Sequence, residues 1–130
     1  MELILMRKEN MTIWGREFEL EIEFDCYPGE TILPIQEEAL TLFLNMKKEI
    51  SDSEKVVKEY YIRHYSEELA EHSITNIFKY VMPKCIFIKR NPQKHIVALL
   101  CNDKFNIEHG MALVFEEKKL FQIGTEDIIL

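Results

Sequence analysis

The C-terminal third of the sequence carries a thiol, an imidazole and a carboxylate within a short stretch. Cys101 ends an apolar run, Asp103 follows it closely, and His109 precedes the next apolar run. If the two runs are neighbouring strands, their facing ends bring the thiol and the imidazole together. A cysteine nucleophile needs a base within hydrogen-bond reach and an acid that orients this base. The weak catalytic candidates are therefore Cys101, His109 and Asp103, which would make the protein a small cysteine-dependent hydrolase.

The same residues have a simpler interpretation, in which they serve packing and a turn. Cys101 follows Val, Ala and Leu residues, and free thiols are among the most buried groups in proteins. Gly110, directly after His109, suits a turn that needs positive φ. The sequence offers no Gly-rich turn around Cys101 and no evident oxyanion donor. We favour this interpretation and assign no catalytic residue.

A second group of candidates is His64, Glu68 and His72, whose spacing aligns them on one face if a single helix spans them. Such a face is able to hold zinc. The spacing is not that of a zinc protease signature, however, and His64 lies within the apolar arc of Val57 and Tyr61. We therefore expect His64 to be a packing residue, and we predict neither a metal nor a cofactor.

Residues 17–25 show the clearest pattern in the sequence, a strict alternation of glutamates with apolar residues. One face carries Glu17, Glu19, Glu21 and Glu23, which predicts a half-buried antiparallel strand with an acidic face. Such a face either keeps a sheet soluble or binds a basic partner, for example a nuclease whose active site binds phosphate. Tyr61 is the aromatic residue that we expect to be exposed at the same contact.

The composition of the chain argues against several classes of binding partner and cellular location. The chain has 130 residues and a formal net charge of −7, which argues against nucleic acid and anionic membranes as partners. Its longest apolar run, 96–101, is too short to cross a bilayer, and the N-terminal charges follow the apolar run instead of preceding it as in a secretory signal. Three cysteines without metal-ligand spacing indicate free thiols in a reducing compartment. We therefore expect a cytoplasmic protein.

The order of the predicted elements indicates the fold class. Short strands over 2–7 and 11–14, with a turn at 8–10, precede the strand at 17–25. Helices are then predicted from Pro34, from a cap at 51–53, and from Ser73 to Met82. Strands follow over 85–88, 96–101, 111–115 and 120–123. We predict one α+β domain over 1–130, with an antiparallel sheet built from N-terminal and C-terminal strands and about three central helices packed on one face.

Four segments are distinctive: the Glu108-His109-Gly110 loop before an apolar strand, the closing Gly124-Thr125-Glu126-Asp127 segment, Trp14-Gly15, and the helix with Gln36-Glu37-Glu38-Ala39-Leu40. Together they resemble a family of small bacterial domains of unknown function. The resemblance covers most of the chain. It implies a bacterial, cytosolic α+β domain whose chemistry is unassigned. Domains of this size and acidity are often immunity proteins that neutralise toxins, an analogy at the level of the fold.

Two functional hypotheses follow from the sequence. The first is a non-enzymatic protein-interaction domain of the toxin-neutralising immunity type, whose partner is a basic protein. The second is the hydrolase built on Cys101 and His109. We favour the first, because the chain lacks the loops and glycines that usually build a substrate pocket.

Overall fold

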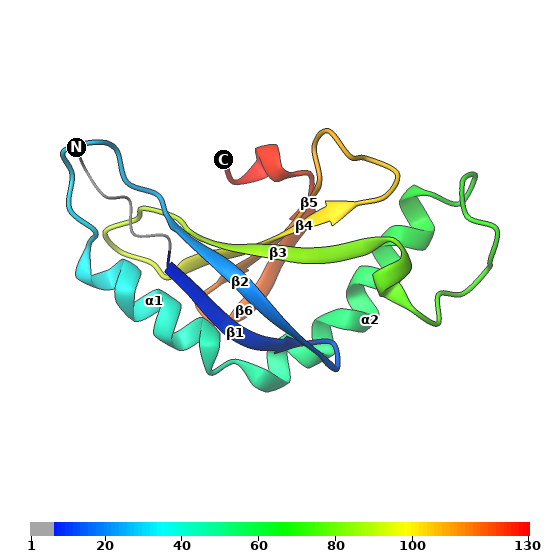
Figure 1. Cartoon of the computed structure of the whole chain (residues 1–130), viewed down its shortest axis with the longest axis horizontal. Helices are drawn as coiled ribbons and strands as arrows, with labels where there is room; N and C mark the ends of the chain where they lie inside the picture. Colours follow the sequence, from blue (N-terminus) through cyan, green and yellow to red (C-terminus); the bar gives the residue numbers. More distant parts are fainter. Residues whose placement is uncertain (1–6) are drawn as a thin grey trace.

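A computed structural model describes residues 7–130 of the chain (Figure 1). Its main element is a six-stranded sheet in the order β1-β2-β3-β4-β5-β6. The strands are β1 (Arg7–Ile13), β2 (Arg16–Phe24), β3 (Val81–Ile88), β4 (Ile96–Asp103), β5 (Met111–Glu116) and β6 (Lys119–Gly124). The helices are α1 (Pro34–Leu44) and α2 (Lys47–His64), and two short 3-10 turns are η1 (Ile77–Lys79) and η2 (Glu126–Ile128).

The sheet is mixed, so the predicted purely antiparallel sheet is wrong. β2 pairs with β3 in parallel, with Glu21 beside Cys85 and Phe24 beside Ile88. All other neighbouring strands pair antiparallel. The reason is the connection: the chain passes through both helices between β2 and β3, and parallel strands require such a long crossover.

The prediction of about three helices is also wrong, because residues 7–130 contain two α-helices and a strand-rich remainder. The segment predicted as a third helix forms only η1 before β3 begins at Val81. Asn76, and not Ser73, caps this turn by accepting a hydrogen bond from the Phe78 amide at 3.0 Å. Pro83 lies inside β3, at the position where its register shifts, which is where a strand tolerates proline.

The turn that the sequence pattern predicted near the N-terminus lies at a different position in the structure. Residues 2–6 of the predicted first strand lie outside the described residues, and the predicted turn at 8–10 is wrong because β1 runs through it. The turn instead consists of Trp14 and Gly15, with φ of 50° and 83°. Two residues with positive φ make the tight hairpin that matches strand twist. The Trp14 indole is buried and donates to the hydroxyl of Ser53 on α2 at 2.9 Å, although Ser53 was predicted to be a helix cap.

Most of the other predicted elements are confirmed. β2 coincides with the alternating segment, and α1 begins at Pro34. The β3–β4 hairpin is present, and β4 is an interior strand, as its two apolar faces predict. β5 and β6 form the final hairpin through Glu117 and Lys118, both with positive φ.

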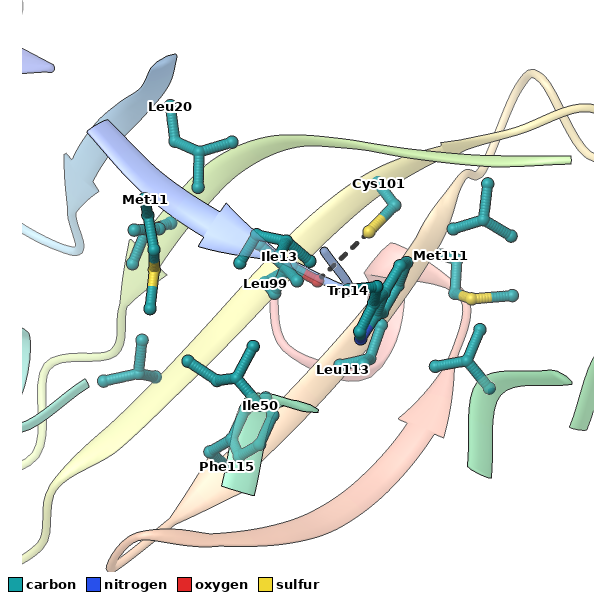
Figure 2. Close-up of a cluster of buried hydrophobic side chains, with 14 of the residues drawn as sticks. Met11, Ile13, Trp14, Leu20, Ile50, Leu99, Cys101, Met111, Leu113 and Phe115 are labelled. Atoms are coloured by element: carbon teal, nitrogen blue, oxygen red, sulfur yellow. Dashed lines mark hydrogen bonds between the residues drawn. The ribbon is translucent and has the colours of Figure 1, made fainter. Parts of the chain in front are cut away.

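The main core lies between the sheet and the two helices (Figure 2). α2 contacts both edge strands, β1 and β6, so the sheet curls around the helices as Figure 1 shows. Ile13 from β1 therefore packs in the same cluster as Leu113 from β5 and Ile50 from α2. Burial of these large apolar side chains is the main stabilising term of the fold.

The opposite face of the sheet carries no α-helix within residues 7–130 and is covered by a smaller segment. The C-terminal segment with η2 lies over it, on the side away from α1 and α2 (Figure 1). Ile128 and Ile129 there pack on Leu100 and Val114. We call this side of the sheet the open face. It is covered near β4 and β5, whereas the outward-facing side chains of β2 are exposed.

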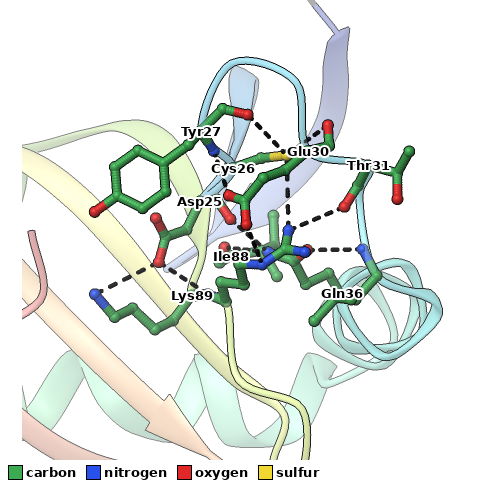
Figure 3. Close-up of polar contacts among 10 residues, drawn as sticks. Asp25, Cys26, Tyr27, Glu30, Thr31, Gln36, Ile88 and Lys89 are labelled. Carbon is green, nitrogen blue, oxygen red and sulfur yellow. Dashed lines mark hydrogen bonds and ion pairs between the residues drawn. The ribbon is translucent and has the colours of Figure 1, made fainter.

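The buried Gln36 joins α1 to the end of the parallel strand pair (Figure 3). Its amide nitrogen donates to the carbonyl oxygens of Asp25 at 3.1 Å and Ile88 at 3.3 Å. Its amide oxygen accepts a hydrogen bond from the Leu33 amide at 2.9 Å, which satisfies an orphan donor before the helix. One side chain thus fixes the position at which the crossover leaves the sheet.

We expect Gln36→Ala to lower the free energy of unfolding by about 2–4 kcal/mol, because it removes the three hydrogen bonds of a buried side chain. Gln36→Glu should also destabilise, since a carboxylate faces two carbonyl oxygens where the amide donated. Urea unfolding monitored by circular dichroism measures both effects. The exposed Gln93→Ala is the matched control, and equal stability of all three variants would show that the bonds to Gln36 contribute little.

Candidate functional site

The four glutamates of β2 lie on the open face of the sheet. Leu20 is fully buried against the helices, whereas Glu17, Glu19, Glu21 and Glu23 are exposed. Their alternation places the carboxylates on one line, because successive side chains of a strand point to opposite faces. We call these four residues the acidic ladder. The structure therefore brings together the residues that the sequence grouped.

A hollow of about 640 Å³ lies beside the acidic ladder. Glu19, Glu21 and Glu23 line one side of it, and Cys85 from β3 and Leu100 from β4 are among its apolar lining. The remaining lining residues are Lys8, Pro83, Lys84, Glu126 and Leu130. We call this hollow the acidic groove. It combines carboxylates with apolar surface, which suits a ligand that carries both positive charge and an apolar group.

Within the acidic groove the carboxylates outnumber the cations. In residues 7–130, Glu19 is the member of the acidic ladder with an ion pair, to Lys8 Nζ at 3.4 Å. Both side chains are half-exposed, so this pair is weak. Lys84 Nζ lies 2.8 Å from Glu126 Oε1 and is largely neutralised there. The groove therefore has a negative potential that attracts cationic groups.

The Cys85 thiol at the floor of the groove is not set up for nucleophilic chemistry. Burial, together with the nearby carboxylates of Glu23 and Glu21, raises its pKa to about 11. A thiol with that pKa is protonated at neutral pH, and the thiolate is the reactive form. Cys85 therefore contributes apolar surface to the groove.

Tyr61 does not accompany the acidic ladder at the surface. It is completely buried on the helix side of the sheet. Its hydroxyl donates to one oxygen of the buried Asp103 at 2.9 Å, and Tyr65 donates to the other oxygen at 2.9 Å. The Phe105 amide also donates to Asp103, at 3.1 Å. Asp103 and its tyrosines therefore form a buried polar network that anchors α2 to the end of β4.

The structure does not bring Cys101 and His109 together. Cys101 is completely buried among Ile13, Leu99 and Met111, and its thiol donates to the Leu99 carbonyl oxygen at 4.0 Å (Figure 2). Burial raises the pKa of this thiol. His109 is exposed in the loop before β5, and Asp103 is bonded to the tyrosines. This arrangement gives the thiol neither a base nor access to a substrate.

Gly110 fills the structural role that the simpler interpretation of this loop predicted. Its φ is 60°, and a Cβ atom there would lie 2.8 Å from the Cys101 carbonyl oxygen. Both the backbone conformation and the close approach require glycine. The Glu-His-Gly segment thus shapes the turn between β4 and β5.

The three residues considered for a metal site are separated by the end of α2. The helix ends at His64, so the spacing that would align Glu68 and His72 with it does not apply. The His64 ring stacks on Tyr60, with centroids 4.0 Å apart, and Nδ1 lies 3.0 Å from the Tyr60 carbonyl oxygen. No cluster of His, Cys, Asp and Glu residues in the described part of the chain is arranged to hold a metal ion.

Sequence reasoning missed the second wall of the acidic groove. Lys84, Glu126 and Leu130 meet the ladder only because β3 pairs in parallel with β2 and the C-terminal segment folds back over the sheet. The charge of Lys84 between Pro83 and Cys85 was the available signal that its side chain faces solvent. No local pattern indicates which strand lies beside β2.

The three thiols should differ in their reaction with iodoacetamide. Cys26 is partly exposed, whereas Cys85 and Cys101 are buried. We expect one thiol to react in the native protein and the other two only after denaturant is added, because alkylation needs an accessible thiolate. Mass spectrometry counts the modified sites, and Cys26→Ser should abolish the fast one. Rapid modification of Cys101 in the native protein would instead support the hydrolase hypothesis.

Stability should fall at alkaline pH because of the tyrosines bonded to Asp103. Burial, together with the bond to Asp103, raises the pKa of Tyr61 and Tyr65 above the ordinary value of 10.0. Both folded tyrosines keep their protons where unfolded ones lose theirs, so their contribution is complete below about pH 10 and is lost as the pH rises further. Each group adds a slope of at most about 1.4 kcal/mol per pH unit.

Urea titrations at several pH values measure this slope. Tyr65→Phe should reduce it, because the substitution removes one of the tyrosines whose pKa the fold raises. Tyr27→Phe is the matched control, since Tyr27 is the most exposed tyrosine and its replacement should leave the slope unchanged. Identical slopes for the wild type and Tyr65→Phe would contradict the assignment.

Comparison with known proteins identifies one family, whose model covers nearly the whole chain. The family described as "Domain of unknown function (DUF6985)" matches residues 5–130, which include every described strand and helix. No curated protein and no solved structure matches the chain. No helix in the described part of the chain is long and apolar enough to span a membrane. The chain belongs to the DUF6985 family of domains of unknown function.

Proposed function

We propose that this protein is a non-enzymatic, cytoplasmic interaction domain that binds a basic protein through the acidic groove. The observation that carries the proposal is the acidic ladder, exposed on the open face beside a hollow with apolar lining. A partner with lysine or arginine side chains gains charge-assisted contacts to the ladder. An apolar side chain of the same partner gains contact with Cys85, Leu100 and Leu130.

The cost of binding at this surface is low. The sheet positions the ladder on a rigid strand, so little conformational freedom is lost when a partner docks. Three of its four carboxylates have no ion pair in the part of the chain that the structure describes, so no such pair is broken. The negative field of the groove also speeds the encounter with a basic partner.

A toxin-neutralising role is the finer form of this proposal. A nuclease that binds phosphate presents a cationic active site, and a line of carboxylates is a surface of matching charge. Covering such a site inhibits the enzyme without any catalysis by the domain. The net charge of −7 supports a basic partner of this kind.

Affinity capture from a lysate of the source cells, with wild-type protein and a charge-reversed variant, tests the proposal. The variant replaces Glu19, Glu21 and Glu23 by lysine. We expect the wild type to retain a basic protein and the variant to bind it at least about tenfold more weakly, because the close charge contacts become repulsive. Added salt should weaken the wild-type complex.

The matched control replaces Glu49, Glu67 and Glu68 by lysine, which gives the same change in net charge at exposed sites outside the groove. Circular dichroism establishes that both variants are folded. Equal loss of binding in both variants would show that net charge, and not the position of the charges in the groove, determines binding. Unchanged binding by the groove variant would exclude the acidic groove as the contact.

A further inference from the structure

The edge strand β6 and the neighbouring helix α2 form a second exposed surface. Phe121 on β6 is 66% exposed, and Val56 on α2 is 42% exposed. A hollow of about 370 Å³ lies between the two elements and is lined by Val56, Glu59, Tyr60, Arg63, Leu120 and Phe121, among others. We call these six residues the β6 patch. Exposed apolar surface of this kind, rimmed by charged residues, marks interaction sites.

A bulge directs Phe121 away from the sheet. Val114 pairs with Gln122 and Phe115 pairs with Leu120, so Phe121 has no partner on β5. An extra residue of this kind bends its strand and re-aims its side chain. The bulge thus presents a large aromatic ring beside a hollow on the same surface.

The two edges of the sheet differ in their protection. β1 begins with Arg7, Lys8 and Glu9, and Arg7 forms an ion pair with Glu37 at 3.0 Å. Charged side chains of this kind discourage pairing between molecules. On β6, residues 120–124 carry no charge at all. The β6 edge therefore lacks the charged side chains that usually prevent an edge strand from pairing with another molecule.

The charges beside the hollow are self-complementary. Glu59 and Arg63 are four residues apart on the exposed face of α2, and neither forms an ion pair within residues 7–130. When two copies of α2 lie antiparallel across a two-fold axis, Glu59 of each copy meets Arg63 of the other. A two-fold interface requires such a surface, in which each contact occurs twice.

From the bulged aromatic, the adjacent hollow and the two opposite charges, we infer that the β6 patch binds a second copy of this chain in a symmetric dimer. Phe121 of each copy packs against Val56 and Tyr60 of the other, and Glu59 pairs with Arg63 twice. This interface uses the sheet edge at β6, whereas the acidic groove is lined by residues of β1 to β4 and the C-terminal segment. The inference is therefore independent of the proposed function.

Sedimentation velocity over a concentration series tests the dimer. The wild type should form a dimer, and Phe121→Glu should weaken it about 30-fold or more, because a central aromatic anchor carries much of an interface. Ile107→Glu is the matched control, since Ile107 is 87% exposed and lies outside the β6 patch. It should dimerise as the wild type does. A wild type that stays monomeric over the whole series would overturn the inference, whichever other protein binds the patch.

Charge swapping tests the two-fold geometry even if Phe121→Glu does not fold. Glu59→Arg and Arg63→Glu should each be monomeric alone, because each places like charges opposite one another. Mixed in equal amounts they should form a heterodimer, since every contact then joins opposite charges. Unchanged dimerisation of either single variant, or no association in the mixture, would overturn the proposed interface. Thermal unfolding of each variant checks that the fold is intact.

Discussion

The parallel pairing of β2 with β3 is the constraint on which the rest of the structure depends. A chain that leaves β2 at Phe24 can lie parallel to it again only after crossing back over the sheet, and α1 and α2 make this crossing. Both helices therefore lie on one face, and their apolar sides form the main core with that face. Gln36 holds the start of the crossing, because it bonds to the backbone at the ends of both parallel strands.

This constraint makes the two faces of the sheet unequal. The helix face is packed with large apolar side chains, and its buried polar groups, such as Asp103, are satisfied. Among residues 7–130, the open face is covered only by the C-terminal segment, which packs on β4 and β5. The glutamates of β2 remain in water, where their mutual repulsion is screened and their presence costs the fold little. The main core thus lies on the helix face, so the exposed glutamates of β2 can be replaced without loss of that core.

Residues with local signals were predictable, and residues placed by long-range pairing were not. The alternation over 17–25 fixed β2 and the face of its glutamates, and Pro34 marked the start of α1. The turn at Trp14 and Gly15 was missed because a buried tryptophan with positive φ depends on the bond from its indole to Ser53, a residue of α2. The third helix was overpredicted because its apolar residues recur at helical spacing, although only Ile77–Lys79 forms a short 3-10 turn. The residues with this spacing are Ile74, Ile77, Phe78 and Val81. The groove needed the β2–β3 register, which no local pattern contains.

The positions of Cys101, His109 and Asp103 in the structure show why residue type and spacing are weak guides to function. The β4–β5 hairpin places Met111, two residues after His109, beside Cys101, but a strand directs alternate side chains to opposite faces. Cys101 falls on the helix face and is buried, while His109 belongs to an exposed loop. Asp103 shares the helix face, where two tyrosine hydroxyls occupy its oxygens. The same alternation of side chains buries Cys101 and Asp103 on the helix face and exposes the glutamates of β2 on the open face. The face of the sheet to which a side chain points therefore decides whether it packs in the core or is free to bind a partner.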